Sequence, residues 1–342
     1  MPKFIILASL VILVVVASVM LFNKEVVPEP SRIPSSPVPT SKSETIPLSI
    51  ESMRQRDYPQ SEFVIVNPLP NGANHNRYIA SYTSDGLTVY GLLTVPMGNK
   101  PEQGWPGIVF IHGHLDPVAY ETTARYVAYQ GRLADSGFVT FKPDLRGHGD
   151  SQGQPVQSNF SPEYVYDALN VVSAFRNYSQ VNPDRIGMWG HSMGGGITLR
   201  SMVVSKDIKA GVMWAGVVGD YEDLLERYRR RIPWMNNSAS ALTKSTYSAF
   251  IEKYGSPSAN MQFWNQIDPY AYLSQISGPV QLHHGTADDS VPVEFSIHLK
   301  TALEKVGKPV EYFEYRGADH NLSGAAFTQA MNRTIGFYKK YL

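Results

Sequence analysis

Cysteine is missing from this 342-residue chain. A disulfide framework, a thiolate nucleophile and a cysteine-ligated metal are therefore excluded. The chain also lacks an excess of charge, because 30 lysine and arginine residues balance 30 aspartate and glutamate residues. No basic cluster with interleaved aromatic residues occurs along it. A nucleic-acid partner is therefore not expected. By contrast, hydrophobic residues make up 43% of the chain, which is enough for a large buried core.

Charged residues are absent from one long apolar segment, residues 4–22. Its 19 residues have the length of a helix that crosses about 30 Å of hydrocarbon. A cleaved signal peptide usually has a shorter apolar region and a small-x-small cleavage site. We therefore expect residues 1–23 to be an uncleaved membrane anchor that leaves the bulk of the chain outside the cytoplasm. Secretion after signal cleavage is the alternative.

A segment rich in proline and serine follows the apolar stretch, over residues 24–50. Proline lacks an amide donor and favours an extended backbone, so repeated prolines oppose regular secondary structure. We expect this segment to be an exposed, semi-rigid linker. The folded domain is then expected to occupy residues 51–342.

Short apolar runs alternate with helical stripes through the rest of the chain. This alternation predicts an α/β fold with a mostly parallel central sheet, helices on both faces and an antiparallel hairpin at its start. We expect strands at 63–66, 78–82, 87–95, 107–111, 138–141, 185–189, 210–218, 280–284 and 310–315, and helices at 122–136, 162–178, 193–204, 293–306 and 325–341.

The sequence Gly-His-Ser-Met-Gly at 190–194 matches the pattern G-x-S-x-G between an expected strand and an expected helix. Such a turn is very tight, and its two glycines let the strand and the helix approach each other closely. The central serine then projects its hydroxyl above the sheet, beside the amides of the helix N-terminus. A purely structural glycine-rich turn is the alternative reading. We predict that Ser192 is a nucleophile.

A serine hydroxyl needs a general base that is itself held by an acid. Asp288 follows the expected strand 280–284, and His320 follows the expected strand 310–315. The order serine, acid, histidine along the chain is the order found in hydrolases with this kind of turn. We therefore predict Asp288 as the acid and His320 as the base. Asp289 is the alternative acid, and Asp319 is expected to be a surface or turn residue.

A tetrahedral intermediate also needs two backbone amides to stabilise its oxyanion. The amide of Met193 is expected to be one of them, because it follows the nucleophile directly. The second should come from the loop after strand 107–111, where we assign the amide of His114 and keep that of Gly113 as the alternative. His112, His114 and Asp116 could together suggest a metal site, but we expect neither a metal nor a cofactor here.

Residues 220–276 form the most irregular part of the pattern. We expect this segment to be a small cap insertion that shapes the pocket. A helical excursion packed on the edge of the sheet is the alternative. Trp234, Phe263 and Trp264 would suit an apolar substrate group in the first case and the core in the second.

Together these motifs resemble the α/β-hydrolase superfamily, and within it the branch of the prolyl-oligopeptidase catalytic domain and the dienelactone hydrolases. The resemblance covers about residues 78–342. It implies a serine hydrolase in which the matching residues Ser192, Asp288 and His320 are nucleophile, acid and base. The residues that carry it are Ser84-Asp85-Gly86, Tyr90-Gly91, His112-Gly113, 144–151, 190–194, Asp268-Pro269-Tyr270, 284–292 and Asp319-His320.

One departure from that branch bears on the substrate. Its oligopeptidases carry a propeller domain that helps to bind the peptide, whereas about 55 residues separate the apolar segment from residue 78, too few for a propeller. We therefore expect a hydrolase of small carboxylic esters that works through an acyl-enzyme. A propeller-less peptidase of the prolyl-oligopeptidase type acting on short peptides is the alternative. A binding protein on a hydrolase scaffold is disfavoured, because no triad position is lost.

Overall fold

Burial begins at Leu48 in the computed structural model, which describes residues 46–59, 61–236 and 241–342. The first helix, α2 (Ile50–Gln55), is capped by Ser49, whose hydroxyl oxygen accepts a hydrogen bond from the amide of Ser52 at 3.1 Å. Because Leu48 and Ile50 are buried, residues 46–50 belong to the folded domain. The expected end of the linker at residue 50 is therefore too late.

The expected anchor at residues 1–23 and most of the expected linker lie outside the described residues. Among the residues that the structure does describe, no helix combines the length and the apolar character needed to cross a membrane.

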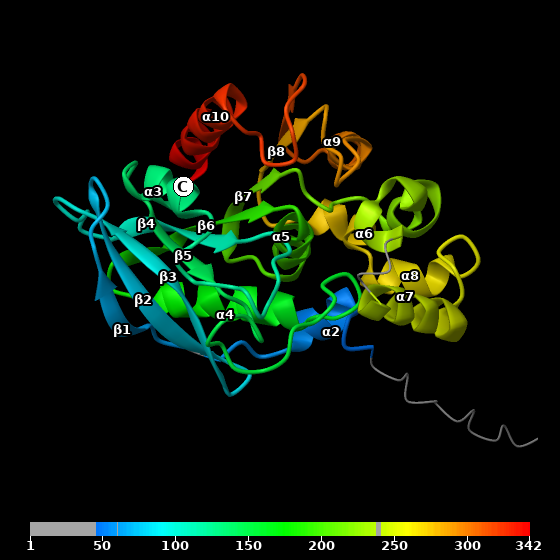
Figure 1. Ribbon diagram of the computed structural model, residues 1–342, viewed down its shortest axis with the longest axis horizontal. Helices are drawn as coiled ribbons and strands as arrows, with labels where there is room; N and C mark the ends of the chain where they lie inside the picture. The colour runs from blue at the N-terminus through cyan, green and yellow to red at the C-terminus, as the bar shows by residue number, and fades with distance from the viewer. Residues whose placement is uncertain (1–45, 60, 237–240) are drawn as a thin grey trace, which may run out of the picture. The chain divides into compact units, whose positions relative to one another are not determined.

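A nine-stranded sheet organises the domain, with the strand order β1-β2-β3-β5-β4-β6-β7-β8-β9 (Figure 1). The first three strands and the β3–β5 pair are antiparallel, and the pairs from β5 to β9 are parallel. This is the α/β fold that the sequence predicts. The strands are β1 (Val64–Leu69), β2 (His75–Ser84), β3 (Leu87–Pro96), β4 (Trp105–Ile111), β5 (Val139–Pro143), β6 (Val181–His191), β7 (Ile208–Trp214), β8 (Val280–Gly285) and β9 (Val310–Tyr315).

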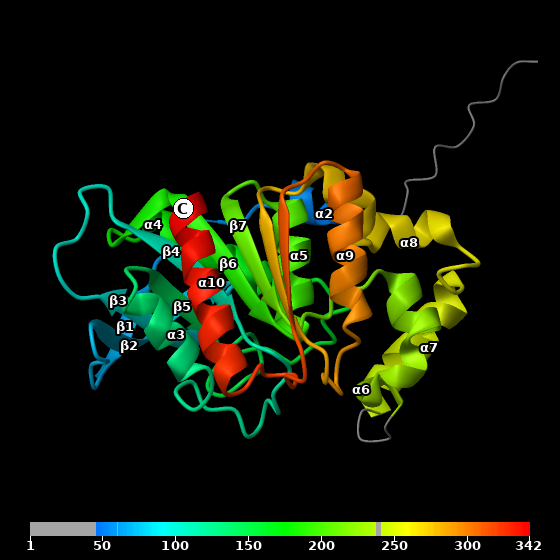
Figure 2. The ribbon, with the colours of Figure 1, turned by 90° about the horizontal axis from the view of Figure 1, so that it is seen from above.

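Helices cover both faces of the sheet, because successive side chains of a buried strand point to opposite sides. In β4, Val109 and Ile111 join the apolar cluster that contains residues of α2, α4, α5 and α9, whereas Ile108 and Phe110 join the cluster that contains residues of α3 and α10. Figure 2 shows α3 and α10 on one side of the sheet. These helices are α3 (Val127–Ala134), α4 (Glu163–Asn177), α5 (Met193–Val204), α9 (Glu294–Lys305) and α10 (Ala325–Tyr341).

Two elements are shorter than expected because a residue beside them adopts a left-handed backbone. The helix expected at 122–136 starts only after Tyr126, which has φ +62°. The strand expected at 210–218 ends at Trp214, because Ala215 has φ +46°. Few residues other than glycine adopt this conformation, so hydrophobic periodicity gives no warning of it.

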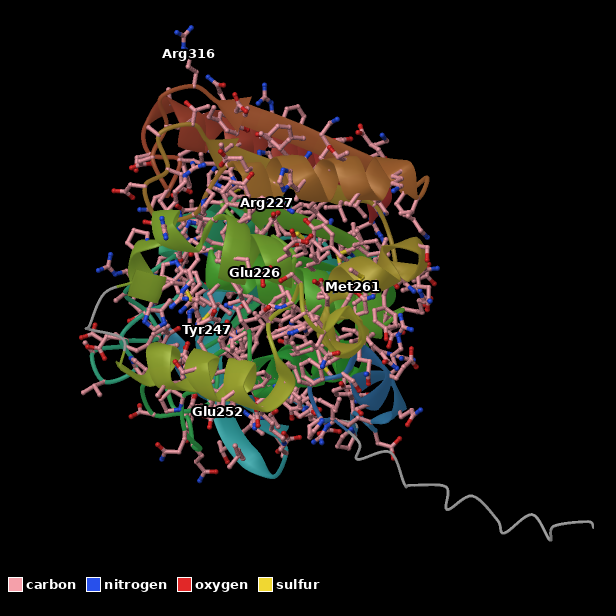
Figure 3. The ribbon with its side chains drawn as sticks, turned by 90° about the vertical axis from the view of Figure 1, so that its right-hand side faces the viewer. Glu226, Arg227, Tyr247, Glu252, Met261 and Arg316 are labelled. Atoms are coloured by element: carbon pink, nitrogen blue, oxygen red, sulfur yellow. The ribbon has the colours of Figure 1, made fainter. Side chains whose placement is uncertain are left out.

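The segment between β7 and β8 consists of short helices (Figure 3). Phe263 is buried and stacks on Tyr254 with ring centroids 3.8 Å apart, and Trp264 donates a hydrogen bond from Nε1 to the carbonyl of Gly255 at 3.1 Å. Phe263 and Trp264 are therefore core residues. The elements are η1 (Asp223–Arg227), η2 (Arg229–Arg231), α6 (Pro233–Asn236), α7 (Ala241–Tyr254), α8 (Met261–Ile267) and η4 (Pro269–Gln275).

Candidate active site

Ser192 lies in the turn between β6 and α5, with φ +55° and ψ −119°. A non-glycine residue in such a conformation is strained, and the surrounding structure must hold it there. The Ser192 amide donates to the carbonyl of Trp214 at 3.0 Å, and the Ser192 carbonyl accepts from the amide of Val217 at 2.9 Å. Hydrogen bonds to the end of β7 and to the segment after it thus fix the serine on both sides.

The two glycines of this turn are required by contact with neighbouring backbone. A Cβ on Gly190 would lie 2.1 Å from the carbonyl oxygen of Gly194. A Cβ on Gly194 would lie 2.3 Å from the carbonyl oxygen of Ile111, at the end of β4. The pattern G-x-S-x-G therefore reflects the close packing of β6, α5 and β4 at this point.

Asp288 and His320 meet at the carboxyl ends of β8 and β9, with Asp288 Oδ2 and His320 Nδ1 separated by 2.8 Å. Burial raises the pKa of the Asp288 carboxyl, but hydrogen bonds from His284, His320 and the amide of Val291 outweigh it and hold this pKa well below its usual range. The carboxylate of Asp288 is thus kept charged beside the histidine.

The neighbouring carboxylate has a different environment. Asp289 is exposed and accepts a hydrogen bond from the hydroxyl of Ser290 at 3.0 Å. Asp319, next to His320, is also exposed and accepts a hydrogen bond from the amide of Ser323 at 2.8 Å. The geometry thus pairs His320 with Asp288 and with neither of these two residues.

His284 is a second histidine on Asp288, to which the sequence analysis assigned no role. Its Nε2 lies 3.1 Å from Asp288 Oδ2 and 3.1 Å from the carbonyl oxygen of Val291. Both neighbours are acceptors, so Nε2 carries the proton, and Nδ1 accepts from the hydroxyl of Ser296 at 2.7 Å. This buried ring orients the Asp288 carboxylate. The sequence carried one signal for this role: His284 lies four residues before Asp288, at the end of β8.

A hydrogen-bond chain links the loop after β4 to the loop that carries His320. The amide of Gly113 donates to the hydroxyl of Tyr126 at 3.0 Å, and this hydroxyl lies 2.8 Å from Nδ1 of His191. His191 Nε2 lies 3.0 Å from the carbonyl oxygen of His320. Because that carbonyl only accepts, Nε2 donates and Nδ1 accepts from Tyr126. Burial lowers the pKa of His191 to about 3, which keeps the ring neutral in this arrangement.

These hydrogen bonds decide which amide is available as the predicted second oxyanion donor. The Gly113 amide already donates to Tyr126. In the part of the chain that the structure describes, the amide of His114 makes no hydrogen bond. Of the two amides considered from the sequence, that of His114 is therefore the one available to a ligand.

Ser192, His320 and His114 border a single cavity of about 390 Å³. No described residue of the segment 220–276 lines it, and the cap role of this segment stays a prediction. The lining comes from the turn at 191–192, the loops at 113–115 and 320–323, and the entrance to α3. The lining residues are Gly113, His114, Leu115, Arg125, Tyr126, Tyr129, His191, Ser192, His320, Asn321 and Ser323.

The residues considered for a metal site do not converge on one point. Both ring nitrogens of His112 face backbone carbonyls, with Nδ1 2.6 Å from the oxygen of Gly113 and Nε2 3.2 Å from that of Asp144. Within the described ranges, no group of three or more histidine, aspartate or glutamate side chains is placed to hold a metal ion.

Sequence comparison finds a family and relatives for this chain. The model of the prolyl oligopeptidase family matches residues 123–342. The Bacillus subtilis protein named "uncharacterized peptidase YtmA" is 27% identical over 253 residues, which are 73% of this chain and 89% of that protein. The peptidase YuxL of the same organism is 24% identical over 70% of this chain, and the match spans 35% of its own length.

Solved structures agree on the fold. A puromycin-hydrolysing peptidase of Mycobacterium tuberculosis superimposes with a TM-score of 0.61 and 20% identity over 78% of this chain, which spans 39% of that larger protein. An acetyl xylan esterase of Paenibacillus sp. R4 gives a TM-score of 0.62 and 17% identity over 86% of this chain and 92% of its own. These likenesses show an α/β-hydrolase fold.

The family match covers well over half of the sequence and includes all three residues of the predicted triad. With the fold and the described geometry, it shows that this chain is a hydrolase and belongs to the prolyl oligopeptidase family.

Proposed function

We propose that the protein hydrolyses small carboxylic esters through an acyl-enzyme on Ser192. The observation that carries the proposal is the 2.8 Å hydrogen bond between His320 and Asp288, on a histidine that shares one cavity with the strained Ser192. A neutral histidine that donates from Nδ1 to a carboxylate has its Nε2 free to accept a proton.

The roles follow from that arrangement. Nε2 of His320 takes the proton of the Ser192 hydroxyl while the serine oxygen attacks the substrate carbonyl. The amides of Met193 and His114 stabilise the negative oxygen of the tetrahedral intermediate. His320 then gives the proton to the leaving group, and the acyl group stays on Ser192. Water, activated by His320, finally attacks the acyl-enzyme and releases the acid.

The way the cavity is built supports esters as the better substrates. Its described lining comes from short loops around the serine and from the entrance to α3, so few groups are available to hold an extended chain. Amide hydrolysis has the poorer leaving group and depends more strongly on accurate positioning of the substrate. Cleavage of short peptides is the second candidate, and the family match together with the relatives named as peptidases favours it.

A substrate panel separates the two candidates. We expect kcat/KM for ethyl butyrate, a non-activated ester, to exceed that for the p-nitroanilides of alanine, proline and acetyl-alanine by at least about 10²-fold. The measurement is the initial rate for each substrate at several concentrations, with Ser192→Ala enzyme as the background. Anilide turnover equal to that of the ester would instead make the protein a peptidase.

Membrane anchoring is a separate proposal, and it rests on the uncharged run at residues 4–22. We expect the full-length chain to sediment with membranes and to stay there in 1 M salt, because apolar insertion is not screened by ions. A chain that starts at residue 46 should be soluble and fully active, since Leu48 is the first buried residue among those that the structure describes. Fractionation followed by an esterase assay tests this. A mature protein in the medium that begins near residue 20 would contradict the anchor.

A further inference from the structure

We propose that the enzyme prefers substrates whose leaving group carries a carboxylate, and that Arg125 binds this carboxylate. The inference depends on the proposed acyl transfer at Ser192 and names a substrate class for it. It begins from the charges that surround the cavity beside the serine.

Arg125 is the one lysine, arginine, aspartate or glutamate among the described residues that line this cavity. Its side chain is exposed, and within the described part of the chain it donates no hydrogen bond and forms no ion pair. A guanidinium that is free and faces a substrate cavity is available to a ligand. Its planar fork of N–H groups matches a carboxylate, to which it can donate two parallel hydrogen bonds.

The backbone beside Arg125 is held in place. Tyr126 has φ +62°, and its hydroxyl is fixed between the amide of Gly113 and the ring of His191. Helix α3 begins directly after Tyr126, and no side chain caps its first amides. The partial positive charge of this helix end has the same sign as Arg125 and adds to the attraction for an anion.

We assign the carboxylate to the leaving group because His320 and Arg125 line the same cavity. A general base that has taken the serine proton must return it to the leaving group, so this group lies beside the histidine. His320, Asn321 and Ser323 line the same cavity as Arg125. The carboxylate is therefore expected on the leaving group, as in the ester of a hydroxy acid or a peptide bond to a C-terminal amino acid.

Matched acetate esters test this inference. The acetate ester of 4-hydroxybenzoate carries a carboxylate on the leaving group, and that of 4-hydroxybenzamide carries a neutral amide of similar shape. After division by their hydroxide-catalysed rates, we expect kcat/KM for the first to exceed that for the second by about tenfold in the natural enzyme. This ratio should fall to near one in Arg125→Gln and recover in part in Arg125→Lys.

Arg132→Gln is the matched control. Arg132 lies on α3, is exposed and donates a hydrogen bond to Asn332 Oδ1 at 3.0 Å, and it does not line the cavity. This variant removes the same charge at a position within α3, seven residues after Arg125 and away from the cavity, so it should keep the natural ratio. A ratio near one in the natural enzyme, or a ratio that Arg125→Gln leaves unchanged, would overturn the inference.

Three further outcomes separate the sources of failure. A preference for p-nitrophenyl hemisuccinate over p-nitrophenyl butyrate that disappears in Arg125→Gln would place the carboxylate on the acyl side and refute the leaving-group assignment. Absence of both ester turnover and fluorophosphonate labelling at Ser192 would refute the proposed function itself. If the fluorophosphonate labels Ser192 but no ester is turned over, the two phenols can be compared as competitors of labelling. Equal protection of Ser192 from the probe by 4-hydroxybenzoate and 4-hydroxybenzamide would refute the role of Arg125 but not the proposed function.

Discussion

Replacement of Ser192 or His320 by alanine is expected to lower kcat on an activated ester by up to about 10⁶-fold, because a triad acts as a unit. In the proposed mechanism, Ser192→Ala removes the oxygen that forms the acyl-enzyme, and His320→Ala removes the base that activates it. The measurement is the burst and steady-state release of p-nitrophenol from p-nitrophenyl acetate. Fluorophosphonate labelling of the natural enzyme, together with its loss in Ser192→Ala, identifies the reactive residue independently.

Asp288→Asn should lower kcat by about 10⁴-fold, less than loss of the serine or the histidine. The asparagine keeps the shape of the side chain, but it can present an N–H to His320 and so favour the wrong tautomer. Asp289→Asn is the matched control, since it removes a carboxylate one residue away that is exposed and bonds only Ser290 in the described structure. Thermal unfolding of each variant shows whether it folds. If Asp289→Asn were the more damaging change, the acid assignment would be wrong.

Gly194→Ala is expected to inactivate the enzyme and to destabilise it by about 3 kcal/mol or more, because the new Cβ would lie 2.3 Å from the carbonyl oxygen of Ile111. That oxygen belongs to the backbone of a central strand and cannot move without shifting β4. The N-terminus of α5 must therefore move, and with it the amide of Met193. A displacement of about 1 Å at a catalytic group costs about 10²-fold in rate, so kcat should fall by at least that factor.

Gly336→Ala makes the same chemical change where there is space for it. Gly336 lies in α10, and a Cβ on it would meet nothing within 4 Å. Alanine in a helix interior is more stable than glycine by about 0.5–1 kcal/mol, so this variant should be slightly stabilised and fully active. Urea unfolding and ester turnover compare the two variants. Normal activity in Gly194→Ala would show that the turn is less tightly packed than the structure indicates.

The sequence by itself predicted the architecture, because its signals are local. Alternating strand and helix periodicities predicted a mostly parallel sheet, and the structure confirms it. The boundaries of α5, β9 and α10 agree with the ranges expected from the pattern. The turn at 190–194 could be predicted because its tightness demands glycine at two fixed positions, and this demand is visible in the residues themselves.

The sequence left open each choice that depends on contacts between distant segments. Asp288 and Asp289 are neighbours of the same type, and only the packing of β8 beside β9 buries one carboxylate against His320 and leaves the other in solvent. Likewise, the amides of Gly113 and His114 differ only because Tyr126 occupies the first of them.

The tertiary structure also decided which side chains surround the serine. Phe263 and Trp264 suit a pocket or a core equally well by composition, and their contacts within the segment between β7 and β8 place them in the core. Arg125 carried no signal in the sequence, because a single arginine at a helix start is usually a solvated surface residue. In the structure it directly precedes the left-handed Tyr126, ahead of α3, and lines the cavity. The sequence thus determined the fold and the tight turn around Ser192, through local rules, whereas the pairing of Asp288 with His320 and the lining of the cavity required the three-dimensional packing of residues far apart in the chain.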